Sequence, residues 1–182
     1  MWDCNTRSNP CSSRQRSKPR MPSSDEFHSR AAEGWLQLGN PNEARREFDR
    51  LSENYRKLCP TLELLWTICA EAKDWKEALK ASRKLGRTDP TNPEAFVHQA
   101  YALHELKRTS EAREVLLKVV KYFPSLPTIP YNLACYACQL DDLAEARKWL
   151  QKAINIAGKN EIKAMAKDDP DLEPLREEIF RS

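Results

Sequence analysis

The sequence predicts an all-α fold built from four copies of one helix pair. The dipeptide Glu-Ala recurs at Glu43-Ala44, Glu77-Ala78, Glu111-Ala112 and Glu145-Ala146, so successive copies lie 34 residues apart. Three equal steps indicate one structural unit repeated four times, and repeats of this length form helix–turn–helix units. Around each copy, apolar residues recur three or four positions apart, which is the spacing of one helix face.

The composition limits the class of protein. Of the 182 residues, 40% are apolar and 31% are charged, as expected of a helical protein with many surface ion pairs. The net charge of +3 is too small to indicate nucleic acid or an anionic membrane as a partner. No apolar run approaches the roughly 18 residues that cross a bilayer, and the N-terminal stretch lacks the apolar segment of a secretory signal. We therefore expect a cytoplasmic protein that binds neither nucleic acid nor membrane.

Residues 1–22 predict a disordered basic arm. The segment holds five basic side chains, the single acid Asp3 and one aromatic residue, Trp2. It cannot bury enough apolar surface to offset the entropy lost on ordering. One alternative is that the arm binds an acidic partner such as nucleic acid. Another is that the natural chain starts at Met21.

Turn and capping residues place the helices in order. Ser23 and Glu26 have the spacing of a capping box and predict a helix over 24–38, which Gly39-Asn40-Pro41 ends. A second helix is expected over 41–56, before Cys59-Pro60. The later helices are expected over 61–72, 75–86, 94–106, 109–122, 129–140 and 143–156, with proline-rich joints at 89–93 and 123–127.

These helices divide the chain into three parts. A four-repeat domain over 23–158 follows the arm, with repeats at about 25–58, 59–92, 93–126 and 127–158. Residues 159–182 predict a C-terminal capping helix and tail. Because the end of a repeat array exposes apolar surface, it needs a terminal helix with a polar outer face. Ile162, Met165 and Ala166 can supply the inner, apolar face.

Each helix pair needs small residues where its two helices cross. The marker alanines Ala44, Ala78, Ala112 and Ala146 supply one side, and the residues twelve positions earlier are Ala32, Trp66, Ala100 and Ala134. Trp66 departs from the pattern, so either the second pair splays or its register shifts. Further positions complete an apolar stripe that predicts the core, namely Trp35, Cys69, Leu103, Ala137, Phe48, Ser82, Leu116, Leu150, Leu51, Leu85, Val119 and Ala153.

These residues resemble the tetratricopeptide repeat (TPR) family over about residues 25–158. The third repeat matches through Phe96, Ala100, Leu103, Ala112, Leu116, Val119 and Pro124, and the fourth through Leu133, Ala134, Ala146, Leu150 and Ala153. Trp66 stands where the family has Gly or Ala, and Pro60 arrives four residues later than the pattern places it. The resemblance implies a right-handed superhelical array of antiparallel helix pairs, a TPR α-solenoid, whose first helices line a concave groove.

The resemblance also indicates which side chains line this groove. In the last two repeats they are Glu94, Val97, His98, Tyr101, His104, Glu105, Tyr131, Asn132, Cys135, Cys138 and Gln139. In the first two they are Ser29, Glu33, Gln37, Glu63, Thr67 and Glu71. Tyr and His side chains offer contact area with hydrogen-bonding tips. We therefore expect the groove to bind a peptide or protein segment; the alternative is that Tyr101 and Tyr131 only pack against each other.

The expected function is that of a non-enzymatic adaptor or scaffold. Some family members grip a C-terminal carboxylate with Lys and Asn, but Ser29 and Glu33 occupy those positions here, and Glu33 would repel a carboxylate. The alternatives are a chaperone for a secreted or aggregation-prone client, and self-association through the array ends. We find no nucleophile–base motif and no glycine-rich phosphate loop.

One motif suggests other chemistry. Cys135-Tyr136-Ala137-Cys138 has the Cys-x-x-Cys spacing of a redox pair or of half a zinc site, and His98 and His104 fall on the neighbouring helix. Structural zinc usually takes four ligands, and no second Cys-x-x-Cys exists. We therefore expect small side chains in a tightly packed helix, with no metal and no cofactor.

Overall fold

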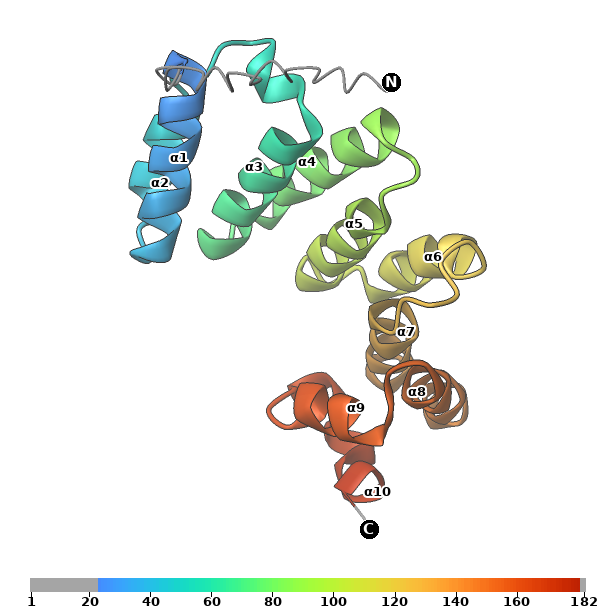
Figure 1. Cartoon of the computed structure of the whole chain (residues 1–182). Helices are drawn as coiled ribbons and strands as arrows, with labels where there is room; N and C mark the ends of the chain where they lie inside the picture. Colours follow the sequence, from blue (N-terminus) through green and yellow to red (C-terminus); the bar gives the residue numbers. More distant parts are fainter. Residues whose placement is uncertain (1–22, 181–182) are drawn as a thin grey trace, which may run out of the picture.

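The structure is a computed structural model that describes residues 23–180. The expected basic arm lies outside the described residues. Within them the chain is helical throughout, so the predicted all-α class is confirmed. The array begins with α1 (Ser24–Gln37) and α2 (Pro41–Phe48), followed by α3 (Cys59–Glu71) and α4 (Trp75–Thr88). It continues with α5 (Pro93–Glu105) and α6 (Thr109–Val119), and then α7 (Thr128–Gln139) and α8 (Leu143–Ala157) (Figure 1).

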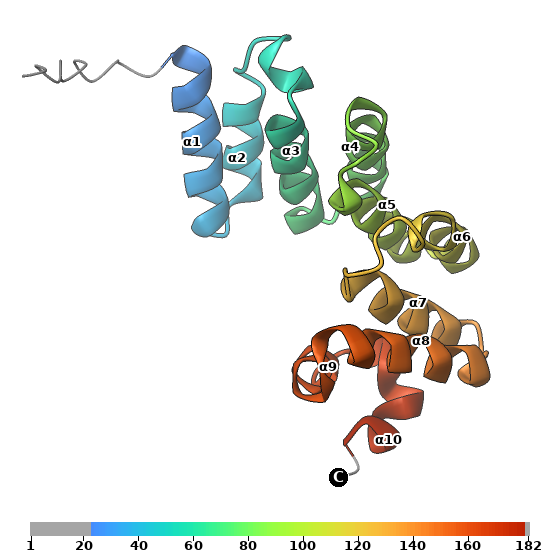
Figure 2. The same cartoon turned by 45° about the vertical axis from the view of Figure 1, so that its right-hand side comes forward.

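The helix pairs follow an arc, and the C-terminal elements close its end. Figure 2 shows the arc, with α5 and α7 toward the inside and α6 on the outside. Gly158, at φ +92°, separates α8 from α9 (Lys159–Ala166). The 3₁₀ helix η2 (Pro170–Leu175) and α10 (Arg176–Phe180) follow, with η2 against α7 and α9 against α8. Ile162, Leu172 and Leu175 are buried there, as a cap over the end of an array requires.

The helices of each pair meet at alanines. Ala44, Ala78, Ala112 and Ala146 have no exposed surface, and neither do Ala32, Ala100 and Ala134. A methyl group at each contact lets the helix axes come close, since larger side chains would hold them apart. Trp66 is only half-buried, and its ring stacks on His98 of α5. The ring therefore contacts the next pair, while Ala78 on α4 remains buried.

The turn inside each pair repeats at the same step as the alanines. Gly39, Lys73, Lys107 and Asp141 all have positive φ, between 56° and 70°. Each ends a first helix in the left-handed conformation that lets the chain reverse. Because Lys73 keeps this step, the register of the second repeat is not shifted. Three of the four are not glycine, so their Cβ atoms strain the backbone.

The start of each second helix explains the marker glutamates. The side chains of Asn40, Asp74 and Asp142 accept hydrogen bonds from the backbone N–H groups of Glu43, Glu77 and Glu145. These are N-caps, and each glutamate lies in the first turn, where the helix dipole favours negative charge. The third repeat has Arg108 at the cap position, and Arg108 instead forms two hydrogen bonds of 2.7 Å with the Glu111 carboxylate.

The structure corrects two expectations about the first repeat. The second helix ends at Phe48 instead of residue 56. It ends there because the Asp25 carboxylate accepts hydrogen bonds from the Ser52 N–H and hydroxyl, at 2.7 Å each, and because the Arg56 guanidinium donates to the Leu51 carbonyl. Trp35, expected in the core, is 36% exposed. It lies on α1, which no earlier helix of the described chain covers.

Replacing Lys107 by glycine should stabilise the fold. Lys107→Gly removes the Cβ strain of a left-handed residue and should raise the free energy of unfolding by roughly 1 kcal/mol. The matched control is Glu114→Gly in the middle of α6, where glycine should lower it by about 1 kcal/mol. Urea unfolding followed by circular dichroism measures both. An unchanged or lowered stability of Lys107→Gly would refute the strain assigned to this turn.

Candidate binding site on the concave face

The concave face carries an open hollow between α3, α4 and α5. Its volume is about 390 Å³, and it is lined by Trp66, Thr67, Ala70, Glu71, Lys73, Trp75 and Tyr101. Trp66 and Tyr101 come from the two first helices, α3 and α5. Trp75 is the first residue of α4, directly after the left-handed turn at Lys73. The turn geometry of the repeat thus brings a residue of a second helix to the concave face.

Three aromatic rings wall this hollow from different directions. The Tyr101 ring lies 5.6 Å from that of Trp75 and 6.3 Å from that of Trp66, with interplanar angles of 66° and 70°. Edge-to-face packing of this kind is favourable for aromatic rings. Tyr101 is 42% exposed, so its ring is open to a ligand as well as to its neighbours.

Behind the hollow, His98 stacks on Trp66. The ring centroids are 3.7 Å apart and the planes are inclined by 8°. Burial lowers the pKa of His98 to about 4, because the charged imidazolium loses hydration there. His98 is therefore neutral at pH 7 and acts as a flat packing surface. The Trp66 indole N–H is buried without an acceptor.

A second hollow adjoins the first and shares Tyr101. It has a volume of about 370 Å³ and is lined by Tyr101, His104, Glu105, Lys107, Asn132, Cys135, Tyr136, Asp169, Pro170 and Asp171. Of the last three residues, Asp169 caps η2, and Pro170 and Asp171 are the first two residues of η2. The chain's own C-terminal segment therefore forms one wall of the groove beside the fourth repeat.

Two carboxylates hold this segment against α5 and α7. The Tyr131 hydroxyl donates to Asp169 Oδ2 at 2.7 Å, and the Cys135 thiol lies 3.6 Å from the same oxygen. His104 Nε2 lies 3.0 Å from Asp171 Oδ2, and His104 Nδ1 lies 3.0 Å from the Thr109 hydroxyl. These contacts cover side chains that a ligand would otherwise meet.

The residues expected in the groove therefore have different surroundings. Tyr101 and Gln139 are exposed, while His98, Glu105 and Asn132 are half-buried. His104, Tyr131, Cys135 and Cys138 are buried, and Val97 packs in the main hydrophobic core. Tyr101 contacts Trp66 and Trp75, whereas Tyr131 bonds to Asp169.

Sequence reasoning missed four components of the site, which are Trp66, Trp75, Asp169 and Asp171. Trp66 was considered only as a departure from the small residues at the helix crossings. Trp75 was assigned to a second helix, and first helices alone were expected to line the groove. Its position directly after the turn was the available signal. Asp169 and Asp171 were read only as the end of a helix, because nothing local in the sequence indicates that they fold back onto α5 and α7.

The Cys-x-x-Cys motif lies in a protected environment. Cys135 and Cys138 are buried free thiols. Burial raises the pKa of Cys138 to about 11, and burial followed by the charge of Asp169 raises that of Cys135 well above its ordinary value. The thiolate is the reactive form, so these pKa shifts oppose redox chemistry. Among residues 23–180, no cluster of three or more His, Cys, Asp or Glu side chains has a metal-binding arrangement.

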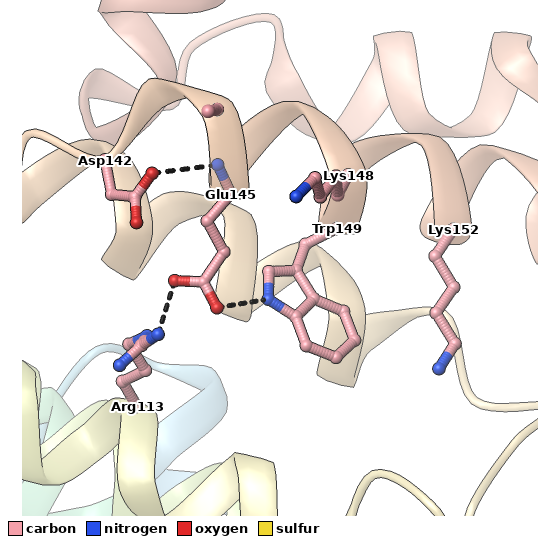
Figure 3. Close-up of a pocket in the computed structure, with 7 residues that line it drawn as sticks. Arg113, Asp142, Glu145, Lys148, Trp149 and Lys152 are labelled. Carbon is pink, nitrogen blue, oxygen red and sulfur yellow. Dashed lines mark hydrogen bonds and ion pairs between the residues drawn. The ribbon is translucent and has the colours of Figure 1, made fainter.

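A pocket on the other side of the array joins the third and fourth repeats (Figure 3). Arg113 of α6 pairs with Glu145 of α8, and Glu145 also accepts a hydrogen bond of 3.2 Å from the Trp149 indole. Asp142 caps α8 through the Glu145 N–H at 2.9 Å. These polar groups satisfy one another, so the marker glutamate here connects two repeats. Ala144, Lys148 and Lys152 complete the lining.

The stacked helix–turn–helix units, with the aromatic hollow lined by α3, α4 and α5, define a helical-repeat protein. Tetratricopeptide-repeat family models match residues 94–125 and 131–160, which hold α5–α6 and α7–α8. The third and fourth helix pairs are therefore tetratricopeptide repeats, as the sequence indicated. None of the helices between residues 23 and 180 is both long and apolar enough to span a membrane.

Solved structures share this fold at low sequence identity. MamA from Desulfovibrio magneticus RS-1 is similar with a TM-score of 0.68 and 18% identity, over 88% of this chain and 93% of that chain. PilF of Pseudomonas aeruginosa is similar with a TM-score of 0.64 and 20% identity, over 86% of this chain and 75% of that chain. The comparison with curated protein sequences returned no match.

Loosening the C-terminal segment should expose the two thiols of the fourth repeat. Leu175→Ala leaves a cavity under η2, which typically costs about 2–5 kcal/mol, so the segment should open more often. We expect Cys135 and Cys138 to react with a thiol reagent at least about tenfold faster. The background for this test carries Cys4→Ser, Cys11→Ser and Cys59→Ser.

Cys69 is the internal control for this test. It is also buried, and burial raises its pKa to about 11, but it lies in the second repeat. Mass spectrometry of the labelled protein separates the sites. Equal acceleration at all three thiols would indicate global unfolding, and no acceleration at Cys135 and Cys138 would show that the segment does not protect them.

His98 should make stability depend on pH. Above pH 6.5 the side chain is neutral in both the folded and the unfolded chain. Between pH 6.5 and about 4, the unfolded chain binds a proton at His98 that the folded chain does not bind. The free energy of unfolding therefore decreases as the pH is lowered through this range, by at most roughly 3 kcal/mol. His98→Phe keeps a flat ring and lacks this titration. Urea unfolding of both proteins from pH 4 to 8 measures the difference, and parallel pH profiles would contradict it.

Proposed function

We propose that this chain is a non-catalytic scaffold that binds a segment of another protein in the open hollow of α3, α4 and α5. Tetratricopeptide repeats are protein-interaction modules, and the MamA and PilF structures share the fold. The observation that carries the proposal is the accessible aromatic surface of Trp66, Trp75 and Tyr101 around one concave hollow. Exposed aromatic groups in a hollow offer a large contact area at low entropic cost.

The neighbouring hollow limits how a partner can enter. Asp169 already contacts Tyr131 of the fourth repeat, and Asp171 contacts His104 of the third. We therefore place the partner over the second and third repeats, with Tyr101 at the border between bound partner and C-terminal segment. This location differs from the groove of the third and fourth repeats that the sequence favoured.

Site-specific photo-crosslinking tests this location. A photo-reactive amino acid in place of Ala70, which lines the hollow, should give discrete adducts in the cells that make the protein. The matched control carries the same amino acid in place of Lys84, an exposed residue of α4 outside the hollow. Adducts lost on Tyr101→Ala would support the site. Adducts at Lys84 alone, or adducts unaffected by Tyr101→Ala, would contradict it.

A further inference from the structure

We propose that the hollow formed by Trp66, Trp75 and Tyr101 binds a cationic side chain, Arg or Lys, of the partner polypeptide. The inference rests on the proposed function, because it assigns the chemistry of the same site. Its components are three aromatic walls and the carboxylate of Glu71 in the lining. A cation is attracted both to aromatic ring faces and to a carboxylate.

The ring geometry suits a cation. Cation–π attraction acts within about 6 Å of a ring centroid. The Trp75 and Trp66 centroids lie 5.6 and 6.3 Å from that of Tyr101, so the Tyr101 ring contacts the other two edge to face. All three also line the hollow together with the Glu71 carboxylate, so a cation in the hollow would approach both aromatic surface and a negative charge. Arg also stacks on aromatic faces.

The lining of the hollow holds one acid and one base, Glu71 and Lys73, and acids outnumber bases once the residues of the second hollow are included. Glu71 lines it, and Glu105, Asp171 and Asp169 lie close to Tyr101. Burial and then the negative charges of Glu105, Asp171 and Asp169 raise the pKa of the Tyr101 hydroxyl. Lys73 is the only cationic side chain in the lining of this hollow. Lys73 opposes a cationic ligand, which makes its replacement diagnostic.

Comparison of the two adjoining hollows argues against an anionic ligand. They are related by the 34-residue step of the repeat, and Glu71 and Lys73 correspond to Glu105 and Lys107. In the second hollow, His104 contacts the carboxylate of Asp171, and the buried Tyr131 donates to the carboxylate of Asp169.

One repeat earlier, the corresponding positions are Val97, which is buried in the core, and Ala70, which lines the first hollow. Neither side chain can donate a hydrogen bond. The first hollow therefore lacks the Tyr and His donors that contact carboxylates at the second, and it has Trp66 and Trp75 where the next repeat has Ala100 and Thr109.

Blocked amino acids test the inference on the full-length chain. The probes are N-acetyl-arginine amide, its neutral isostere N-acetyl-citrulline amide, and N-acetyl-leucine amide for a purely apolar occupant. Titration is followed by the indole N–H signals of Trp66 and Trp75 in NMR spectra. We expect the arginine amide to bind at least about fivefold more tightly than either neutral probe.

Four variants identify the source of this preference. Glu71→Gln should weaken binding of the arginine amide, Lys73→Ala should tighten it, and Tyr101→Leu should remove it while keeping apolar bulk. Tyr122→Ala is the matched control, since Tyr122 is an exposed aromatic residue outside both hollows and should leave binding unchanged.

Several results would overturn the inference. These are equal or tighter binding of citrulline or leucine amide, weaker binding after Lys73→Ala, or no binding of the arginine amide at its solubility limit. If these occur while photo-crosslinks at the Ala70 position still depend on Tyr101, the groove remains the partner site and only its assigned chemistry fails. If the crosslinks are absent as well, both proposals fail.

Discussion

The close approach of two helices at buried alanines is the constraint on which the rest of this structure depends. Each pair brings a methyl group of its second helix against the first helix, with no exposed surface left at the marker alanine. Larger side chains at these contacts would separate the helices and change the angle between successive pairs. The left-handed turn inside each pair recurs at the same 34-residue interval as the alanines. In the second pair this turn places Trp75, the first residue of α4, beside Trp66 and Tyr101 in the hollow.

Much of the fold was predictable because its causes are local and periodic. Helix starts follow from cap residues such as Ser23, and the crossing points follow from the alanine step. The early end of α2 was not predictable, because it depends on the contact between Asp25 and Ser52, 27 residues apart. The exposure of Trp35 likewise depends on the absence of a preceding helix among the described residues. A stripe of apolar residues cannot indicate which members lack a neighbour.

The site was predictable only in part for a related reason. Helical spacing predicted that Tyr101 faces the groove, and in the structure Tyr101 is exposed and lines the hollow beside Trp66 and Trp75. The covering of Tyr131 depends on Asp169, 38 residues later in the chain, and no local pattern encodes such a contact. Trp66 was a departure from the repeat pattern, and this departure coincides with the aromatic hollow. Residues that break a repeat without unfolding it are where specific binding can arise.

The account divides the concave face into an open part over the second and third repeats and a closed part under the C-terminal segment. Hydroxyl-radical footprinting with mass spectrometry tests this division most directly, because it reports the solvent access of individual aromatic rings. We predict strong modification of Tyr101, approaching that of the exposed Tyr122, with Tyr131 and Tyr136 protected. Modification of Tyr131 and Tyr136 to the same extent as Tyr101 would contradict the division.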